Sequence, residues 1–124
     1  MNIAIVGATG NVGRKTLEVI EKKNFKFDNL YLVASQKSAG KKISFKNKDY
    51  LVENLETYDF SKANITFFAA GGKISEKYAE KAAEHTTVID NSSFFRMDPD
   101  VPLIVPQVNG SEVKKMKKNI IANP

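Results

Sequence analysis

Residues 3–13 read IAIVGATGNVG, an apolar run that leads directly into glycines at positions 7, 10 and 13. The unbroken run predicts a strand buried on both faces, over residues 2–6. In a strand–turn–helix unit, the first glycine permits the tight turn, the second lets the backbone approach a pyrophosphate, and the third allows close helix packing. We therefore expect Gly7, Gly10 and Gly13 to form the phosphate loop of a dinucleotide site.

A purely structural glycine turn remains the alternative. The spacing here is GxxGxxG, whereas GxGxxG is the commoner arrangement, and glycines between strands and helices also serve packing alone. The free amides and the positive dipole end of a following helix favour the phosphate interpretation.

Outward from this loop, strand-length apolar runs alternate with segments of helical period, which predicts a doubly wound α/β fold. We expect one Rossmann-like domain over residues 1–124, with a mostly parallel sheet that is incomplete at its C-terminus. In the first helix, the apolar residues are expected on one face and Glu18 and Lys22 as a solvent-side pair. That apolar face comprises Val12, Leu17, Val19 and Ile20. The expected elements are strands at 30–34, 65–69, 88–90 and 119–122, helices at 12–23, 74–84 and 111–118, a loop at 91–102, and a hairpin or antiparallel edge within 41–56 that turns at Asn47–Lys48.

Composition excludes several classes of function. The 124 residues are 42% hydrophobic and 27% charged, and they include no cysteine, so disulfides and thiolate metal sites are excluded and no metal is expected. Among the 19 basic residues Arg14 and Arg96 are the arginines, and the lysines are dispersed. The net charge of +5 therefore indicates a solvated basic surface rather than a nucleic-acid partner. No apolar run approaches the roughly 20 residues of a membrane helix, so a cytoplasmic protein is expected.

The segment after the second strand bears on the choice of cofactor. It reads ASQKSAGKK from residue 34 and contains no acid that could bind a ribose 2′-hydroxyl, as an NAD site usually does. Ser35, Lys37, Ser38 and Lys41 instead suit a 2′-phosphate, which favours NADP. An ordinary polar loop is the alternative.

Taken in order, the motifs GATGNVG, ASQKSAGK, FFAAGG, VIDNSSFFRMDPDVPLIVPQVN and NIIANP resemble the amino-terminal half of bacterial aspartate-β-semialdehyde dehydrogenase. The resemblance covers nearly the whole chain. It implies an NADPH-dependent oxidoreductase that reduces β-aspartyl phosphate to the semialdehyde, in lysine, threonine and methionine biosynthesis. It also implies a homodimeric full-length enzyme with phosphate as the second product.

The resemblance further assigns roles to individual residues. Many relatives have Arg where Lys37 stands, and because this exchange replaces a forked cation with a point charge, selectivity for NADP over NAD is expected to be looser. The assignments are Thr9, Gly10, Asn11 and Val12 for the pyrophosphate, Lys37 and Ser38 for the 2′-phosphate, Ala70 and Gly71 for the ribose, and Arg96 for the substrate phosphate.

Other polar residues are weaker candidates. Arg96 could instead be a surface arginine that caps a carbonyl group or pairs with Asp98 or Asp100. His85 is expected to cap a helix end on the solvent side. Ser92 and Ser93 have no histidine placed to activate them, so loop hydrogen bonding or contact with the nicotinamide end is expected.

In the family, the motif continues past ANP through one residue to a catalytic cysteine, and the assisting histidine comes much later. The hypothesis is therefore a fragment that lacks the catalytic and dimerisation domain, binds the cofactor, cannot turn over, and leaves apolar surface uncovered. The alternatives are a non-catalytic NADP-binding module and an enzyme like N-acetylglutamyl-phosphate reductase.

Overall fold

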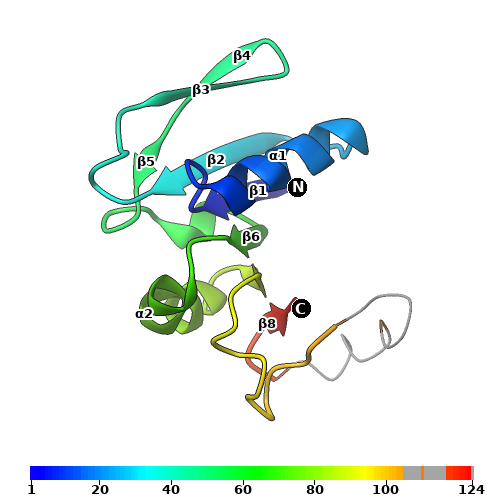
Figure 1. Cartoon of the computed structure of the whole chain (residues 1–124). Helices are drawn as coiled ribbons and strands as arrows, with labels where there is room; N and C mark the ends of the chain where they lie inside the picture. Colours follow the sequence, from blue (N-terminus) through cyan, green and yellow to red (C-terminus); the bar gives the residue numbers. More distant parts are fainter. Residues whose placement is uncertain (105–109, 111–116, 124) are drawn as a thin grey trace.

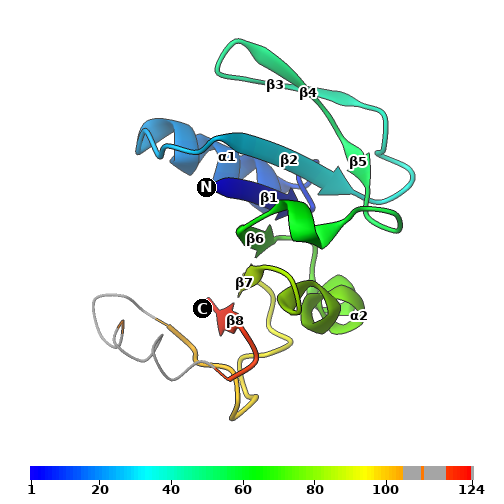
Figure 2. The ribbon, with the colours of Figure 1, turned by 180° about the vertical axis from the view of Figure 1, so that it is seen from behind.

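The computed structural model describes residues 1–104, 110 and 117–123, and its central element is a six-stranded parallel sheet in the order β5-β2-β1-β6-β7-β8 (Figure 1). A separate two-stranded sheet, β3-β4, extends beyond the β5 end of this sheet, away from β8 (Figure 2). The elements are β1 Asn2–Val6, α1 Asn11–Lys22, β2 Asn29–Ala34, β3 Lys42–Phe45, β4 Lys48–Leu51, β5 Glu53–Asn54, the 3₁₀ turn η1 Phe60–Lys62, β6 Ile65–Phe68, α2 Gly72–Ala83, β7 Thr87–Asp90 and β8 Ile120–Ala122.

The chain winds outward from β1 in two directions, which confirms the expected doubly wound fold. β1 pairs in parallel with β2 on one side and with β6 on the other. Alternate residues of β1 consequently face two different cores: Ile3 and Ile5 pack with the buried residues of α1, and Ala4 and Val6 pack with those of α2. Both faces of β1 are therefore covered, which explains its continuous apolar sequence.

Helix α1 buries a narrower face than its sequence predicts. Leu17 and Ile20 are buried against the sheet, as expected, but Val12 and Val19 are 50% and 47% exposed. The helix covers β1 and β2 and does not extend over β6 to β8, so these two valines lie at its uncovered flank. The expected pair is also different, because Glu18 forms its ion pair with Lys15, at 3.3 Å, one turn earlier.

The hairpin prediction is confirmed, but its turn is shifted by one residue. Phe45 pairs with Lys48, so the turn residues are Lys46 and Asn47 rather than Asn47 and Lys48. Both have positive φ, 51° and 64°, as a two-residue turn requires if it is to match the twist of its strands. The chain then adds β5 in parallel to β2, an edge strand that the sequence pattern did not separate from the hairpin.

The other predicted elements lie within two residues of the observed ones. Helix α2 begins at Gly72, two residues before its expected start, and residues 91–102 form the expected loop. The helix predicted over 111–118 lies largely outside the described residues. Within the described ranges, no helix has the length and apolar character needed to cross a membrane.

Candidate functional site

A cavity of about 350 Å³ lies where the sheet reverses its winding direction, at the carboxyl ends of β1, β2 and β6. Open α/β sheets bind ligands at this switch point. Its walls come from the ends of β1, β2, β5 and β6 with the loops that follow them, and from the start of α2. They comprise Val6, Gly7, Thr9, Gly10, Ala34, Ser35, Leu55, Ala69, Ala70 and Ile74. Five of the residues predicted from the sequence, Gly7, Thr9, Gly10, Ser35 and Ala70, are thus brought together.

The structure explains the three glycines of the first loop in different ways. Gly7 has φ +88°, and a Cβ there would lie 2.7 Å from the Ala69 carbonyl oxygen. A Cβ on Gly13 would lie 2.1 Å from the Gly7 oxygen, so this glycine allows the helix to pack on the turn. A Cβ on Gly10 would meet the Gly7 oxygen at an ordinary 3.5 Å. Packing within the chain therefore requires the first and third glycines but not the second, which borders the cavity.

The start of α1 is open to an anion. Its N-cap residue Gly10 provides no side-chain hydrogen bond, and the first turn contains no acidic residue. The first amides of a helix have no acceptor within the helix, so those of Asn11, Val12 and Gly13 remain available beside the cavity. Backbone amides and the positive end of the helix dipole together suit a phosphate group. The Asn11 and Val12 side chains point elsewhere and line a second cavity, described below.

The loop after β2 lies against the glycine loop. The Thr9 hydroxyl donates to the Ser38 hydroxyl across 3.3 Å, and the Ser38 amide donates to the Ser35 carbonyl at 2.9 Å. Lys37 is exposed on the same turn, and the Lys41 amide donates to the Ser38 carbonyl. The turn thus gathers hydroxyls and cations at the edge of the cavity, and none of its residues is acidic.

The loop after β6 completes the cavity wall. Gly71 is the N-cap of α2 and has φ +90°, a conformation that side chains with a Cβ rarely adopt. Nothing lies within 4 Å of the place where its Cβ would be, so the conformation rather than crowding requires glycine here. Ala70 contributes to the cavity wall directly, and Gly71 turns the chain into α2 beside it.

Arg96 lies outside the cavity, on the loop that follows β7. Its Nη2 donates to the Asn91 carbonyl at 3.5 Å, which is the carbonyl contact expected of a surface arginine. The two aspartates considered as its partners bind other cations, because Asp98 pairs with Lys118 at 3.0 Å and Asp100 with Lys117 at 3.6 Å. Among the described residues no carboxylate is paired with Arg96, so its charge is available to an anionic ligand.

The pKa of the Asp98 carboxyl is lowered, first by the hydrogen bond from the Asp100 amide and then by Lys118. This carboxylate therefore stays charged and paired at neutral pH.

The sequence analysis missed Asp90, which is completely buried at the end of β7. Its Oδ1 accepts from the Ser75 hydroxyl at 2.7 Å and from the Ser92 amide at 2.9 Å, and its Oδ2 accepts from the Ser92 hydroxyl at 2.8 Å. The pattern Asp-Asn-Ser after a strand could have indicated it, since an Asp side chain commonly bonds the backbone amide two residues on. The contact with Ser75 of α2 has no local signal.

The remaining polar candidates lie where the sequence placed them, in the loop after β7 and at the end of α2. Ser92 makes the loop hydrogen bonds just described, as expected, and Ser93 is exposed. His85 is exposed just after α2, with its amide bonded to the Ala82 carbonyl, which fits the expected solvent-side position. The described residues contain no group of three or more side chains suited to a metal ion.

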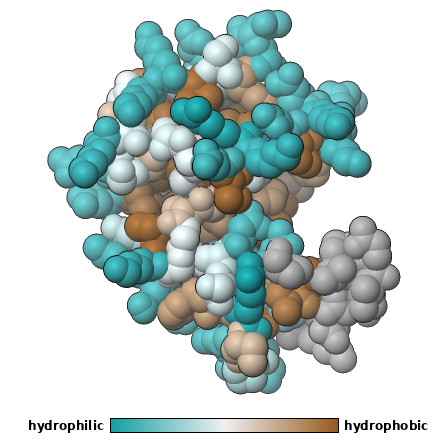
Figure 3. Space-filling view, viewed as in Figure 1, coloured by the Kyte–Doolittle hydropathy of each residue, from teal (hydrophilic) through white to brown (hydrophobic). Residues whose placement is uncertain are grey.

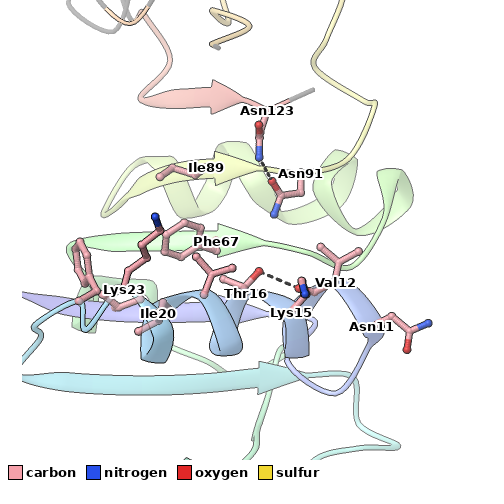
Figure 4. Close-up of a pocket in the computed structure, with 13 residues that line it drawn as sticks. Asn11, Val12, Lys15, Thr16, Ile20, Lys23, Phe67, Ile89, Asn91 and Asn123 are labelled. Carbon is pink, nitrogen blue, oxygen red and sulfur yellow. Dashed lines mark hydrogen bonds between the residues drawn. The ribbon is translucent and has the colours of Figure 1, made fainter. Parts of the chain in front are cut away.

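A second cavity, an apolar groove of about 800 Å³, lies on the α1 face of the sheet. In Figure 3 hydrophobic side chains reach the surface in the middle of this face, between more hydrophilic regions. Figure 4 shows α1 on one side of the groove, β7 and β8 on the other, and Phe67 of β6 between them. The exposed valines of α1 belong to this groove, and Asn123 donates to the Asn91 side-chain oxygen at its end. The apolar surface expected from the sequence is thus present.

Comparison with known proteins agrees with the motifs. Residues 2–116 match the family described as semialdehyde dehydrogenase, NAD binding domain. The chain is 53% identical to the aspartate-semialdehyde dehydrogenase of Aquifex aeolicus and 48% identical to aspartate-semialdehyde dehydrogenase 2 of Vibrio cholerae. These alignments cover 98% and 99% of the chain and 37% of each relative. The chain therefore spans about 37% of the length of these curated relatives.

Solved structures show the same likeness. The crystal structure of aspartate semialdehyde dehydrogenase II from Vibrio cholerae, complexed with ASA, superposes with a TM-score of 0.95 at 48% identity, covering 99% of this chain and 41% of that one. The enzyme from Candida albicans, solved with NADP, gives a TM-score of 0.73 at 27% identity, covering 98% and 42%. The predicted resemblance and the predicted fold class are confirmed.

Proposed function

Since the chain belongs to the semialdehyde dehydrogenase NAD-binding domain family, we propose that it is the cofactor-binding part of an NADP-dependent aspartate-semialdehyde dehydrogenase. A nicotinamide dinucleotide follows from the family. The choice of NADP over NAD, the residues that bind it, and the reaction of the complete protein are the proposal.

One observation carries the proposal: the glycine loop, the uncapped start of α1 and the loop after β2 all border one cavity at the switch point of the sheet. The pyrophosphate binds the amides at the start of α1, between Gly10 and Gly13. The ribose lies beside Ala70 and Gly71. Gly10 supports this arrangement, because no packing against the described residues explains why this position is a glycine.

The preference for NADP rests on the loop after β2. Ser35, Lys37 and Ser38 offer hydroxyls and a cation to a 2′-phosphate, and no carboxylate on this turn would repel it. The Candida albicans relative was solved with NADP, which agrees with this preference. Lys37 provides a single positive charge rather than a fork, so we expect selectivity that is real but moderate.

For the reaction, we propose reductive dephosphorylation of β-aspartyl phosphate, with Arg96 binding the substrate phosphate. The open guanidinium supports this role, because Asp98 and Asp100 are bound to lysines. The chain contains no cysteine, so a thiol nucleophile would come from outside residues 1–124. A homodimer of the complete enzyme is part of the same proposal.

Isothermal titration calorimetry of this chain with NADPH and NADH tests the cofactor assignment. Lys37→Glu is expected to weaken NADPH binding at least about tenfold, because a charge-assisted bond to phosphate is lost and a repulsion is added, and to leave NADH binding unchanged. The matched control is Lys26→Glu, the same charge reversal on an exposed lysine before β2, near the amino end of a strand whose carboxyl end borders the cavity. Equal affinity for NADH and NADPH in the unmodified chain would contradict the proposal.

The substrate assignment needs the protein encoded by the complete gene. Assayed with NADPH, it is expected to reduce β-aspartyl phosphate in preference to N-acetylglutamyl phosphate. The reverse preference would support the rival reductase. A gene that encodes no cysteine shortly after Pro124 would support a non-catalytic NADP-binding module instead.

A further inference from the structure

Asp90 is a charged residue that the proposed reaction leaves unused. It is completely buried, at the end of β7, and its carboxylate accepts three hydrogen bonds from two residues. A buried carboxylate is costly unless it is fully hydrogen-bonded, and one that is so bonded fixes its partners in place. The partners here are Ser75 in the first turn of α2 and Ser92 in the loop that carries Arg96.

The peptide group between Asn91 and Ser92 links this carboxylate to Arg96. Its N–H donates to the Asp90 Oδ1 at 2.9 Å, and its C=O accepts from the Arg96 Nη2 at 3.5 Å. The carbonyl and the amide hydrogen of a trans peptide point in opposite directions within one rigid plane. Fixing the N–H on Asp90 therefore aims the carbonyl at the guanidinium.

The same carboxylate holds the loop relative to the cofactor cavity. Ser75 lies in the first turn of α2, a helix that begins two residues after Ala70 of the cavity wall. The Ser92 hydroxyl, which donates to Asp90, also accepts from the Phe94 amide at 3.3 Å, so the bonding continues toward Arg96. Phe95, which is 1% exposed, packs in the hydrophobic core and so holds the loop against it.

We propose that Asp90 is a positioning residue: through the Asn91–Ser92 peptide and the Ser92 hydroxyl it sets the position of the Arg96 guanidinium relative to the cofactor cavity. The inference rests on the proposed function for the identity of the ligand, a substrate phosphate. The geometry of the positioning does not depend on that identity.

Nitrogen-15 NMR of this chain tests the proposal. Arg14 and Arg96 are its two arginines, so each Nε signal can be assigned by substitution, and Arg14, exposed on α1, serves as an internal reference. The ¹⁵N–¹H heteronuclear NOE of Arg96 Nε reports whether the guanidinium is held. Inorganic phosphate is then titrated in the presence of saturating NADPH, which occupies the pyrophosphate site.

Two variants remove the bond between the Asp90 carboxylate and the Ser92 hydroxyl in different ways. Asp90→Asn replaces an oxygen that accepts from the Ser92 hydroxyl, and Ser92→Ala removes that hydroxyl while the buried carboxylate remains. The matched control is Asp98→Asn, an aspartate of the same loop that bonds Lys118 and the Asp100 amide. Circular dichroism establishes whether each variant is folded. If Asp90→Asn does not fold, the result for Ser92→Ala decides whether Asp90 positions Arg96.

In the unmodified chain, the NOE of Arg96 Nε is expected to exceed that of Arg14. In Asp90→Asn and Ser92→Ala it falls to the Arg14 value, phosphate binding weakens about tenfold, and NADPH binding is unchanged. Asp98→Asn behaves like the unmodified chain. An Arg96 signal that stays ordered in both folded variants would overturn the positioning role. A chain that binds neither NADPH nor phosphate would instead refute the proposed function, and the NOE comparison would still decide the role of Asp90.

Discussion

The Thr9 and Ser38 hydroxyls lie 3.3 Å apart, joining the glycine loop after β1 to the polar turn after β2 although 29 residues separate them in the sequence. Thr9 lines the cavity at the switch point, so the contact holds the polar turn beside that cavity. It also places a hydroxyl that we assign to the 2′-phosphate beside the loop assigned to the pyrophosphate.

Ser38→Ala is expected to weaken NADPH binding by about tenfold and NADH binding much less. The substitution removes a hydrogen bond to the charged 2′-phosphate, and such a bond contributes about 1.5–3 kcal/mol. NADH has no 2′-phosphate and so does not make this bond. Calorimetry with both cofactors measures the difference. Ser44→Ala, which removes an exposed hydroxyl from β3, is the control. Equal losses for both cofactors would assign Ser38 to loop structure alone.

The second and third glycines of the loop are expected to respond differently to alanine. Gly13→Ala places a methyl group 2.1 Å from the Gly7 oxygen and should lower the free energy of unfolding by about 3 kcal/mol. Gly10→Ala meets no such overlap and should cost about 1 kcal/mol or less, as a change at an N-cap.

For NADPH affinity the expected order is the reverse. Gly10→Ala should weaken binding more than Gly13→Ala, because Gly10 lines the cavity and its new methyl group would take up space there. Urea unfolding and NADPH calorimetry on both variants measure the two effects. Retention of full NADPH affinity by Gly10→Ala would be inconsistent with a pyrophosphate in contact with this loop.

Tyr58 has a buried hydroxyl with no hydrogen-bond partner among the described residues. Tyr58→Phe is therefore expected to leave the free energy of unfolding unchanged or to raise it by up to about 1 kcal/mol. Urea denaturation at pH 7 measures this change. A loss well above 1 kcal/mol would show that the hydroxyl has a partner.

The same residue predicts a pH dependence. Burial, followed by the nearby Glu53 carboxylate, raises the pKa of the Tyr58 phenol above its ordinary value of 10.0. The fold thus favours the neutral form, so this contribution to stability is complete below pH 10 and is lost as the pH rises further. Above pH 10 the free energy of unfolding of Tyr58→Phe should therefore fall less steeply with pH than that of the unmodified chain, as measured by urea denaturation at several pH values. Tyr50→Phe, at a partly buried tyrosine of the hairpin, is the control.

Two apolar residues on α1 are expected to differ in their effect on stability. Leu17 is buried against the sheet, and Leu17→Ala should cost about 2–5 kcal/mol. Val19→Ala should change the free energy of unfolding by less than about 0.5 kcal/mol, because the side chain is half exposed at the apolar groove. Thermal unfolding compares them, and a loss for Val19→Ala as large as that for Leu17→Ala would contradict the exposure of Val19.

The motifs predicted most of the fold, because each depends on local properties of the chain. Apolar runs without alternation specify strands buried on both faces, and the glycines specify the turn after β1. The turn of the hairpin was displaced by one residue because strand twist requires positive φ at Lys46, a conformation that its side chain does not signal. Val12 and Val19 were expected on the apolar face of the first helix but are exposed, because helical spacing cannot reveal how far the neighbouring sheet extends.

By itself, the sequence determined the doubly wound arrangement, the glycine loop and the absence of acids after β2, since these follow from backbone conformation and residue type. The tertiary structure decided which side chains meet: Thr9 with Ser38, Ser75 with Asp90, and Asp98 with Lys118 in place of Arg96. These pairs join separate elements, so they exist only once the layers have packed and set the distances between residues that are remote in the chain.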